Sequence, residues 1–153
     1  MIKTMELGPH LNVPAPDFGV LSHTNHVMSL ESLMGERGLV LGFSGDIWEP
    51  ASVRRILWFQ RYFPQFARLK VNLGLLLCNQ PHQLYGYSMS SVTRLEFPLL
   101  ADVNREVHAL YNMERYAGLV VVDATGIIRD KWLMPDERVW PKAPELMAVL
   151  EML

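Results

Sequence analysis

Apolar residues along this chain gather in short runs and in helical stripes, separated by glycine, proline and polar turns. Two nearly continuous apolar runs, at 39–43 and 71–78, are typical of strands buried on both faces of a sheet. Between them, apolar residues recur at helical spacing with arginines on the other side, which predicts an amphipathic helix. We expect Pro64 to kink or split this helix. Its apolar positions are Val53, Ile56, Phe59 or Gln60, Phe63 and Phe66.

Shorter patterns flank this unit of strand, helix and strand. Two short strands at 18–21 and 27–29, on either side of a polar turn, predict a hairpin. Helices are expected over 82–95 and 104–112, and Asp102 is placed to cap the second of them. The chain therefore continues in two helices after its second buried strand.

The last third of the chain predicts a second hairpin, from strands at 119–123 and 127–133, and a final helix at about 143–153. The complete order of elements predicts an α/β domain of thioredoxin-like type, with a mixed central sheet and helices on both faces. We expect a single domain over 1–153, of which 1–12 form a short N-terminal extension.

Composition and charge restrict the class of protein. The 153 residues carry a net charge of −2 and 50% of them are hydrophobic, which suits one folded domain with a sizeable core. No run of lysine or arginine favours binding to nucleic acid or to an anionic membrane, and no apolar stretch has the length of a membrane span. The single cysteine excludes an intrachain disulfide and a Cys-x-x-Cys module. We therefore expect a soluble, cytoplasmic protein with no cofactor.

Five segments follow one another in the order of a known protein family. Together they resemble peroxiredoxins and related redoxins of the alkyl hydroperoxide reductase and thiol-specific antioxidant family, in one register over about residues 12–134. The resemblance implies a thioredoxin-like fold of peroxiredoxin type and the family activity, thiol-dependent reduction of peroxides. The segments are VPAPDFGVLSHTNHVMSLESLMGERGLVLGF at 13–43, YFPQF at 62–66, VNLGLLLC at 71–78, FPLLAD at 97–102 and VVVDATGIIR at 120–129.

The resemblance places the catalytic motif of the family, P-x-x-x-T-x-x-C, on residues 45–52. In the family the cysteine attacks as a thiolate, whose pKa is lowered by a helix N-terminus and a nearby arginine. Here Gly45 stands for the proline, Glu49 for the threonine and Ser52 for the cysteine, and only the additional proline, Pro50, is retained. The chain therefore lacks the peroxidatic cysteine.

Serine cannot replace this cysteine, because its hydroxyl is a far weaker acid and a helix dipole contributes only about 0.3–1 kcal/mol. A carboxylate at Glu49 would also raise the pKa of a neighbouring thiol. We therefore expect a non-catalytic binding or regulatory protein on a peroxiredoxin scaffold. The motif residues then either form a repurposed pocket for a small ligand or metal, or simply begin a helix, with Pro50 in the first turn, Glu49 complementing the dipole and Ser52 satisfying free N–H groups.

The arginine of the family aligns with Ala117 in this chain. Arg115 lies two residues earlier and, in an extended segment, on the same side. It either reaches the motif pocket and pairs with Glu49, or is a solvated surface residue.

Cys78 is the only thiol, at the carboxyl end of a predicted central strand, where α/β sheets tend to bind ligands. It is either a buried structural cysteine or a relocated redox residue. The second reading makes the protein an atypical single-cysteine thiol oxidoreductase or peroxidase that uses an external thiol reductant. The only potential base nearby in the sequence is His82, four residues on.

His23 and His26 lie in the polar turn of the first hairpin and are either turn residues or a weak metal site. No other pattern for a metal is present in the sequence. For partners we expect a homodimer, because proteins of this family commonly pair, and either a protein partner or a thiol reductant. Nucleic acid and membrane are not expected.

Overall fold

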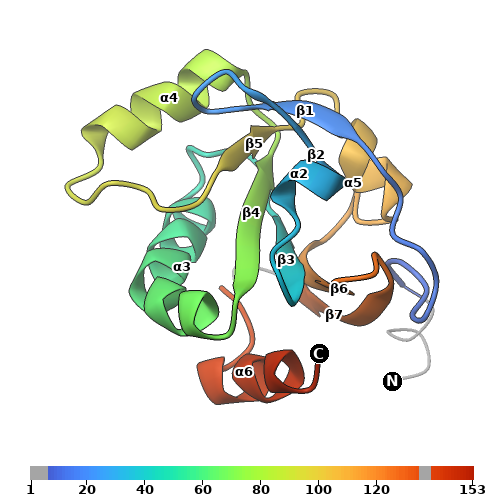
Figure 1. The fold of residues 1–153 in the computed structure, drawn as a ribbon. Helices are drawn as coiled ribbons and strands as arrows, with labels where there is room; N and C mark the ends of the chain where they lie inside the picture. The colour runs from blue at the N-terminus through green and yellow to red at the C-terminus, as the bar shows by residue number, and fades with distance from the viewer. Residues whose placement is uncertain (1–6, 135–138) are drawn as a thin grey trace.

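The computed structural model describes residues 7–134 and 139–153. Its centre is a seven-stranded mixed sheet with the strand order β2-β1-β5-β4-β3-β6-β7 (Figure 1). The strands are β1 (Gly19–Ser22), β2 (Val27–Ser29), β3 (Gly38–Phe43), β4 (Val71–Leu77), β5 (Leu99–Ala101), β6 (Ala117–Asp123) and β7 (Ile128–Met134). The helices are α2 (Leu30–Leu33), α3 (Pro50–Arg68), α4 (Pro81–Ser90), α5 (Glu106–Leu110) and α6 (Ala143–Glu151).

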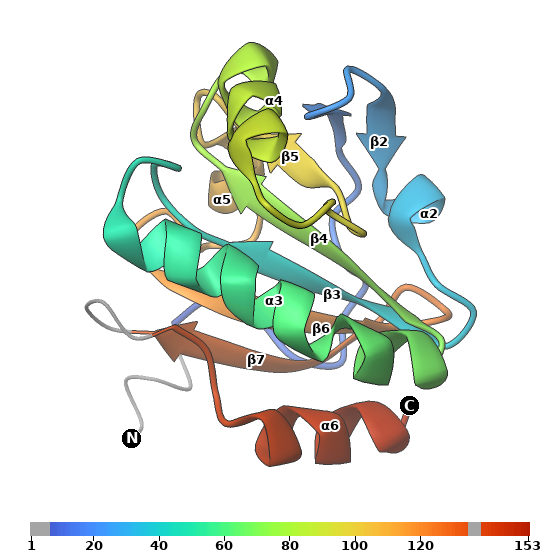
Figure 2. The same cartoon turned by 90° about the vertical axis from the view of Figure 1, so that its left-hand side faces the viewer.

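Helices cover both faces of the sheet, as predicted (Figure 2). Successive residues of a strand point to opposite faces, so the central strands contribute side chains to two separate hydrophobic cores. One core lies against α3, α4 and α6 and includes Phe59, Leu84 and Leu146. The other lies against α2 and α5 and includes Leu33 and Val107. The apolar runs of β3 and β4 are continuous because both faces of these strands are covered.

The strands β3, β4 and β5 are parallel neighbours, whereas β6 joins β3 in the antiparallel sense. Both predicted hairpins are confirmed, as β1 with β2 and β6 with β7. The strand β5 was not predicted from the sequence, because three apolar residues within a loop carry no recognisable period. The mixed thioredoxin-like sheet is nevertheless the predicted one.

Three helix predictions need correction. The helix expected over 82–95 ends at Ser90, where the hydroxyl of Ser90 donates to the carbonyl of Tyr87 and competes with continued helix. The helix expected over 104–112 is reduced to α5. Pro64 does not split α3, which runs through it as one helix. Pro64 is exposed, so solvent can bond the carbonyl that proline leaves without an N–H partner.

The N-terminal segment described here, from Leu7 onward, lies along β7. The amide of Asn12 donates to the carbonyl of Ile128 at 2.7 Å, and the ammonium of Lys131 donates to the carbonyl of Leu7 at 2.6 Å. The first half of the expected extension, residues 1–6, lies outside the described residues. Among the helices of 7–134 and 139–153, none has the length and apolarity needed to cross a membrane.

Candidate functional site

Three polar residues meet at one edge of the sheet because each directly follows a parallel strand. Ser44 follows β3, Cys78 follows β4 and Asp102 follows β5. The carboxyl ends of parallel strands lie at the same edge, which is where ligand sites of α/β sheets are found. The fold therefore gathers a hydroxyl, a thiol and a carboxylate from distant parts of the sequence.

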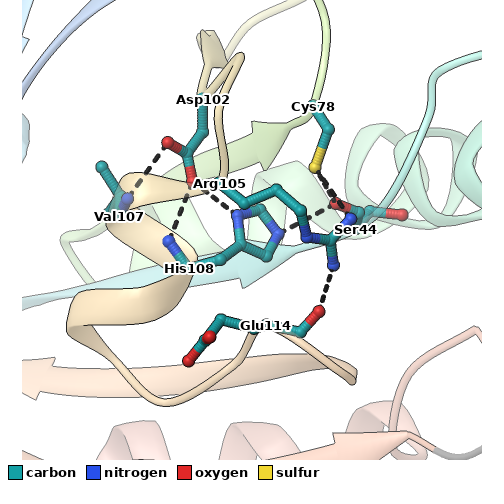
Figure 3. Close-up of polar contacts among 7 residues, drawn as sticks. All are labelled: Ser44, Cys78, Asp102, Arg105, Val107, His108 and Glu114. Carbon is teal, nitrogen blue, oxygen red and sulfur yellow. Dashed lines mark hydrogen bonds and ion pairs between the residues drawn. The ribbon is translucent and has the colours of Figure 1, made fainter.

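The thiol of Cys78 is half-buried and lies against a guanidinium (Figure 3). The Nη1 atom of Arg105 donates to Sγ at 3.2 Å, and the thiol faces the carbonyl oxygen of Ser44 at 3.8 Å. Arg105 precedes α5 in the left-handed backbone region, with φ of 59°, and its Nη2 donates to the carbonyl of Glu114. The guanidinium is thus held between a backbone oxygen and the sulfur.

A buried pair, Asp102 and His108, lies beside the thiol. The carboxylate of Asp102 accepts the amides of Val107 and His108, at 3.0 and 2.8 Å, and the ring Nδ1–H of His108 at 2.6 Å. The ring Nε2 donates to the carbonyl of Ser44 at 3.0 Å. Both ring nitrogens thus lie within hydrogen-bond distance of an oxygen atom. One carbonyl, that of Ser44, therefore contacts both His108 and Cys78.

The electrostatic surroundings set the protonation of these groups. Burial has the largest effect on the Cys78 thiol and raises its pKa. The Arg105 guanidinium lowers this pKa, and nearby carboxylates, of which Asp102 has the largest effect, raise it. As a result, the pKa of Cys78 is above its usual value. Burial also raises the pKa of Asp102, but hydrogen bonds from His108 and Val107 outweigh this effect and hold it below its usual value. At neutral pH the site holds a carboxylate and a neutral thiol.

Ser52, which the resemblance assigns to the position of the peroxidatic cysteine, is completely buried in the first turn of α3. Its hydroxyl lies 2.8 Å from Oγ of Ser44, which also accepts Nη1–H of the buried Arg55 at 3.1 Å. The expectation that Ser52 satisfies helix N–H groups is therefore wrong. The hydroxyl instead contacts Ser44 and so links the start of α3 to the end of β3.

Glu49 and Gly45, at the other altered motif positions, are coupled to each other. Glu49 is the N-cap residue of α3, but its side chain makes no hydrogen bond to the helix amides. The carboxylate of Glu49 instead accepts a hydrogen bond from the amide of Asp46, at 2.9 Å. A Cβ atom at Gly45 would lie 2.5 Å from the Oε1 atom of Glu49. The glutamate in its present position thus favours glycine where the family has proline. Pro50 occupies the first helical turn, as expected.

Comparison with known proteins agrees with this architecture. The model for the AhpC/TSA family matches residues 11–131. The chain belongs to the AhpC/TSA family. No curated protein matches it.

Solved peroxiredoxin structures share the fold of this AhpC/TSA protein. Peroxidoxin BcpB from Mycobacterium tuberculosis superposes with a TM-score of 0.79 at 18% identity, over 94% of this chain and 97% of that one. A mitochondrial 2-Cys peroxiredoxin from Plasmodium falciparum gives 0.73 at 18% identity, over 93% and 92%. The yeast mitochondrial 1-Cys peroxiredoxin gives 0.81 at 19% identity, over 93% and 75%. The thioredoxin-like fold of peroxiredoxin type is thereby confirmed.

The arginine at the site of this AhpC/TSA protein is Arg105, not Arg115. Arg115 is exposed and lines a separate hollow with Leu7 and Tyr116. Across the described residues no ion pair links Arg115 to Glu49, so the pairing considered above is wrong. Sequence reasoning missed Arg105, Ser44 and His108. The available signal for Ser44 was its place directly after a buried strand, whereas no comparable pattern marked Arg105 and His108 at the start of α5.

The two histidines of the first hairpin make structural hydrogen bonds, His23 to β5 and His26 to a side chain of the turn. Nδ1 of His23 accepts the amide of Leu99 at 3.1 Å, and Nδ1 of His26 lies 2.9 Å from Oγ1 of Thr24. Within the described ranges, no group of three or more histidine, cysteine or acidic side chains is placed to hold a metal ion. In the part of the chain that the structure describes, the exposed His82 of α4 makes no hydrogen bond with Cys78, whereas His108 contacts the same carbonyl as the thiol.

Proposed function

We propose that this AhpC/TSA protein is a non-catalytic member of its family, which acts as a binding or regulatory protein in the cytoplasm. The observation that carries the proposal is the state of Ser52. Its hydroxyl is fully buried and bonded to Ser44, and within 7–134 and 139–153 it has no imidazole or carboxylate partner that could act as a base. A group in this state neither meets a peroxide nor attacks one.

The state of Cys78 supports the same proposal. A peroxide is attacked by the thiolate, and the raised pKa of Cys78 leaves little thiolate at neutral pH. The thiol also donates toward the carbonyl of Ser44, a contact that ionisation would remove. The unpaired cysteine suits a reducing compartment such as the cytoplasm.

Peroxide consumption tests the proposal. Hydrogen peroxide and an organic hydroperoxide are offered to the native protein with dithiothreitol, glutathione or a thioredoxin system as reductant. We expect consumption by the native protein and by Cys78→Ser to equal that of the reductant alone. Turnover that persists in Cys78→Ser would contradict the proposal, because it would require chemistry at another residue.

A second candidate function is a single-cysteine thiol oxidoreductase, favoured by the 3.2 Å contact between Nη1 of Arg105 and Sγ of Cys78. In this reaction the Cys78 thiolate attacks one peroxide oxygen, an S–O bond forms and the O–O bond breaks. The product is sulfenic acid, and the leaving oxygen takes a proton. One external thiol then attacks the sulfenic acid, releases water and forms a mixed disulfide with Cys78. A second external thiol attacks this mixed disulfide, which frees the Cys78 thiol and joins the two external thiols in a disulfide.

Thiol titration with intact-mass analysis separates the two candidates. Under the first, Cys78 labels slowly with maleimide near neutral pH and gains no oxygen mass after brief exposure to hydrogen peroxide. Under the second, it gains one oxygen and returns to the thiol on addition of reductant. Turnover that is lost in Cys78→Ser and reduced in Arg105→Ala would establish the second candidate and overturn the first.

A further inference from the structure

A hollow of about 430 Å³ lies between the turn of the first hairpin and the N-terminal end of α4 (Figure 1). Pockets that hold small molecules in proteins have volumes of about 300–1,000 Å³. The lining of this hollow shares no residue with the candidate site around Cys78, so the hollow is a separate feature of the surface. Its lining residues are His23, Thr24, Asn25, Pro81, His82 and Tyr85.

Two hydrogen bonds to Leu99 of β5 hold His23 in the wall of this hollow. The backbone amide of His23 donates to the carbonyl of Leu99 at 2.8 Å, and the ring Nδ1 accepts the amide of Leu99 at 3.1 Å. The side chain is half-buried. The imidazole therefore has a fixed orientation, with its Nδ1 toward the sheet.

The hydrogen bond from Leu99 also decides which ring nitrogen of His23 carries the proton. A backbone N–H group can only donate, so Nδ1 accepts with its lone pair and carries no proton. Burial has the largest effect on the ring and lowers the pKa of His23 below its usual value, which keeps the ring neutral at neutral pH. The single proton of this neutral ring is then on Nε2. His23 therefore offers the hollow a hydrogen-bond donor.

This protonation argues against the metal site considered above for His23. A metal ion binds an imidazole through a nitrogen lone pair. The lone pair of Nδ1 is engaged with the amide of Leu99, and Nε2 carries the proton. A metal ion would have to break the bond to Leu99 or displace that proton. The ring is thus suited to donate to a ligand and not to coordinate an ion.

The walls of the hollow are uncharged and are formed largely by rings. The lining includes no Asp, Glu, Lys or Arg. Tyr85 is 50% exposed and His82 is exposed, and Pro81 adds a third ring beside them. A charged ligand would lose hydration here without gaining an ion pair. A flat, uncharged ligand instead stacks on aromatic rings at little desolvation cost.

We propose that this hollow binds a small, flat, uncharged molecule that carries a carbonyl oxygen. The ring of the ligand packs against Tyr85 and His82, and its carbonyl oxygen accepts the Nε2–H of His23. Aromatic amides, lactams and quinones are molecules of this class. Ligand binding at this hollow is distinct from any chemistry at Cys78.

The protonation of His23 is measured directly in the native protein. Long-range ¹H–¹⁵N spectra identify which ring nitrogen carries the proton, and near neutral pH we expect it on Nε2. A proton on Nδ1, or on both nitrogens, would overturn the proposal. A titration with Zn²⁺ that saturates at the His23 ring would overturn it too.

Three probes of similar size test the chemical class of the ligand. Nicotinamide is flat and uncharged and has a carbonyl, nicotinate carries a negative charge, and 3-methylpyridine lacks the carbonyl. In titrations followed by the ¹H–¹⁵N signals of the native backbone, we expect nicotinamide to cause saturable shifts at 23–25 and 82–85. The dissociation constants of the other two probes should be at least about threefold larger. Equal affinities, or no saturable shift at these residues, would contradict the proposal.

A variant of α4 checks the position of the ligand. Tyr85→Ala removes one wall of the hollow and leaves the bond between His23 and Leu99 in place, so the dissociation constant of nicotinamide should rise at least about threefold. Met89→Ala is the matched control, because Met89 is 67% exposed on the same helix but does not line the hollow. Unchanged affinity in Tyr85→Ala, or an equal loss in Met89→Ala, would place the ligand elsewhere and refute the proposal. None of these outcomes depends on peroxide turnover.

Discussion

The Nη1 atom of Arg105 donates a hydrogen bond to Sγ of Cys78 at 3.2 Å, although 27 positions separate the two residues in the sequence. The contact arises because Cys78 follows β4 while Arg105 follows β5, and these strands are parallel neighbours. Among the described residues, Arg105 is the group whose charge favours the thiolate of Cys78. Burial and nearby carboxylates act in the opposite direction and prevail.

Removal of the guanidinium should therefore make Cys78 a weaker acid still. In Arg105→Ala we expect the pKa from the pH dependence of maleimide labelling to rise above that of the native protein, with several-fold slower labelling near pH 8. Arg105→Lys should retain part of the effect. Arg115→Ala, at an exposed arginine that makes no hydrogen bond to the thiol among the described residues, should label at the native rate. Equal labelling of Arg105→Ala and the native protein would show that the contact has no electrostatic effect.

Restoring the family cysteine by itself should not restore its chemistry. In a chain that carries Cys78→Ser, Ser52→Cys places a thiol where the native side chain is completely buried. We expect this thiol to label only after denaturation and to consume no peroxide, because it is inaccessible and the Glu49 carboxylate disfavours its thiolate. Fast labelling of the folded variant, with its circular dichroism unchanged, would refute this expectation.

The buried Asp102 carboxylate should make stability depend on pH in the acid range. Its pKa in the folded protein is below the usual value of about 3.9, so its contribution is present above that value and is lost as pH falls through the folded pKa. We expect Asp102→Asn to lower the free energy of unfolding in urea at pH 7 by about 3 kcal/mol, since His108 loses its charged partner. The difference should shrink below about pH 4. The exposed Asp46, replaced by asparagine, is the control, and a difference unchanged down to pH 2 would contradict the assignment.

Gly86 should limit the stability of α4. It lies inside this helix and is exposed, and nothing in the chain lies within 4 Å of a Cβ atom built at this position. In Gly86→Ala we therefore expect the free energy of unfolding to rise by about 0.5–1 kcal/mol, because alanine is a better helix former. Urea denaturation measures the change, and a variant no more stable than the native protein would contradict the expectation.

The sequence by itself determined much of the fold. The apolar runs of β3 and β4 identify strands covered on both faces, and the stripe of α3 identifies a helix with one buried side, because burial imposes a period on the local sequence. The expectation that Ser52 stands at the position of the peroxidatic cysteine likewise came from the sequence alone, since it depends only on which residue occupies a motif position.

Only the tertiary structure decided how the site is assembled. The carbonyl of Ser44 meets both His108 and Cys78, and its hydroxyl meets Ser52, through contacts that bridge up to 64 positions of sequence. The tertiary structure also decided that Arg105, and not Arg115, contacts the thiol of Cys78. Such contacts follow from strand order and register, which join residues far apart in the chain, whereas local patterns report only whether a residue is buried and in which kind of element.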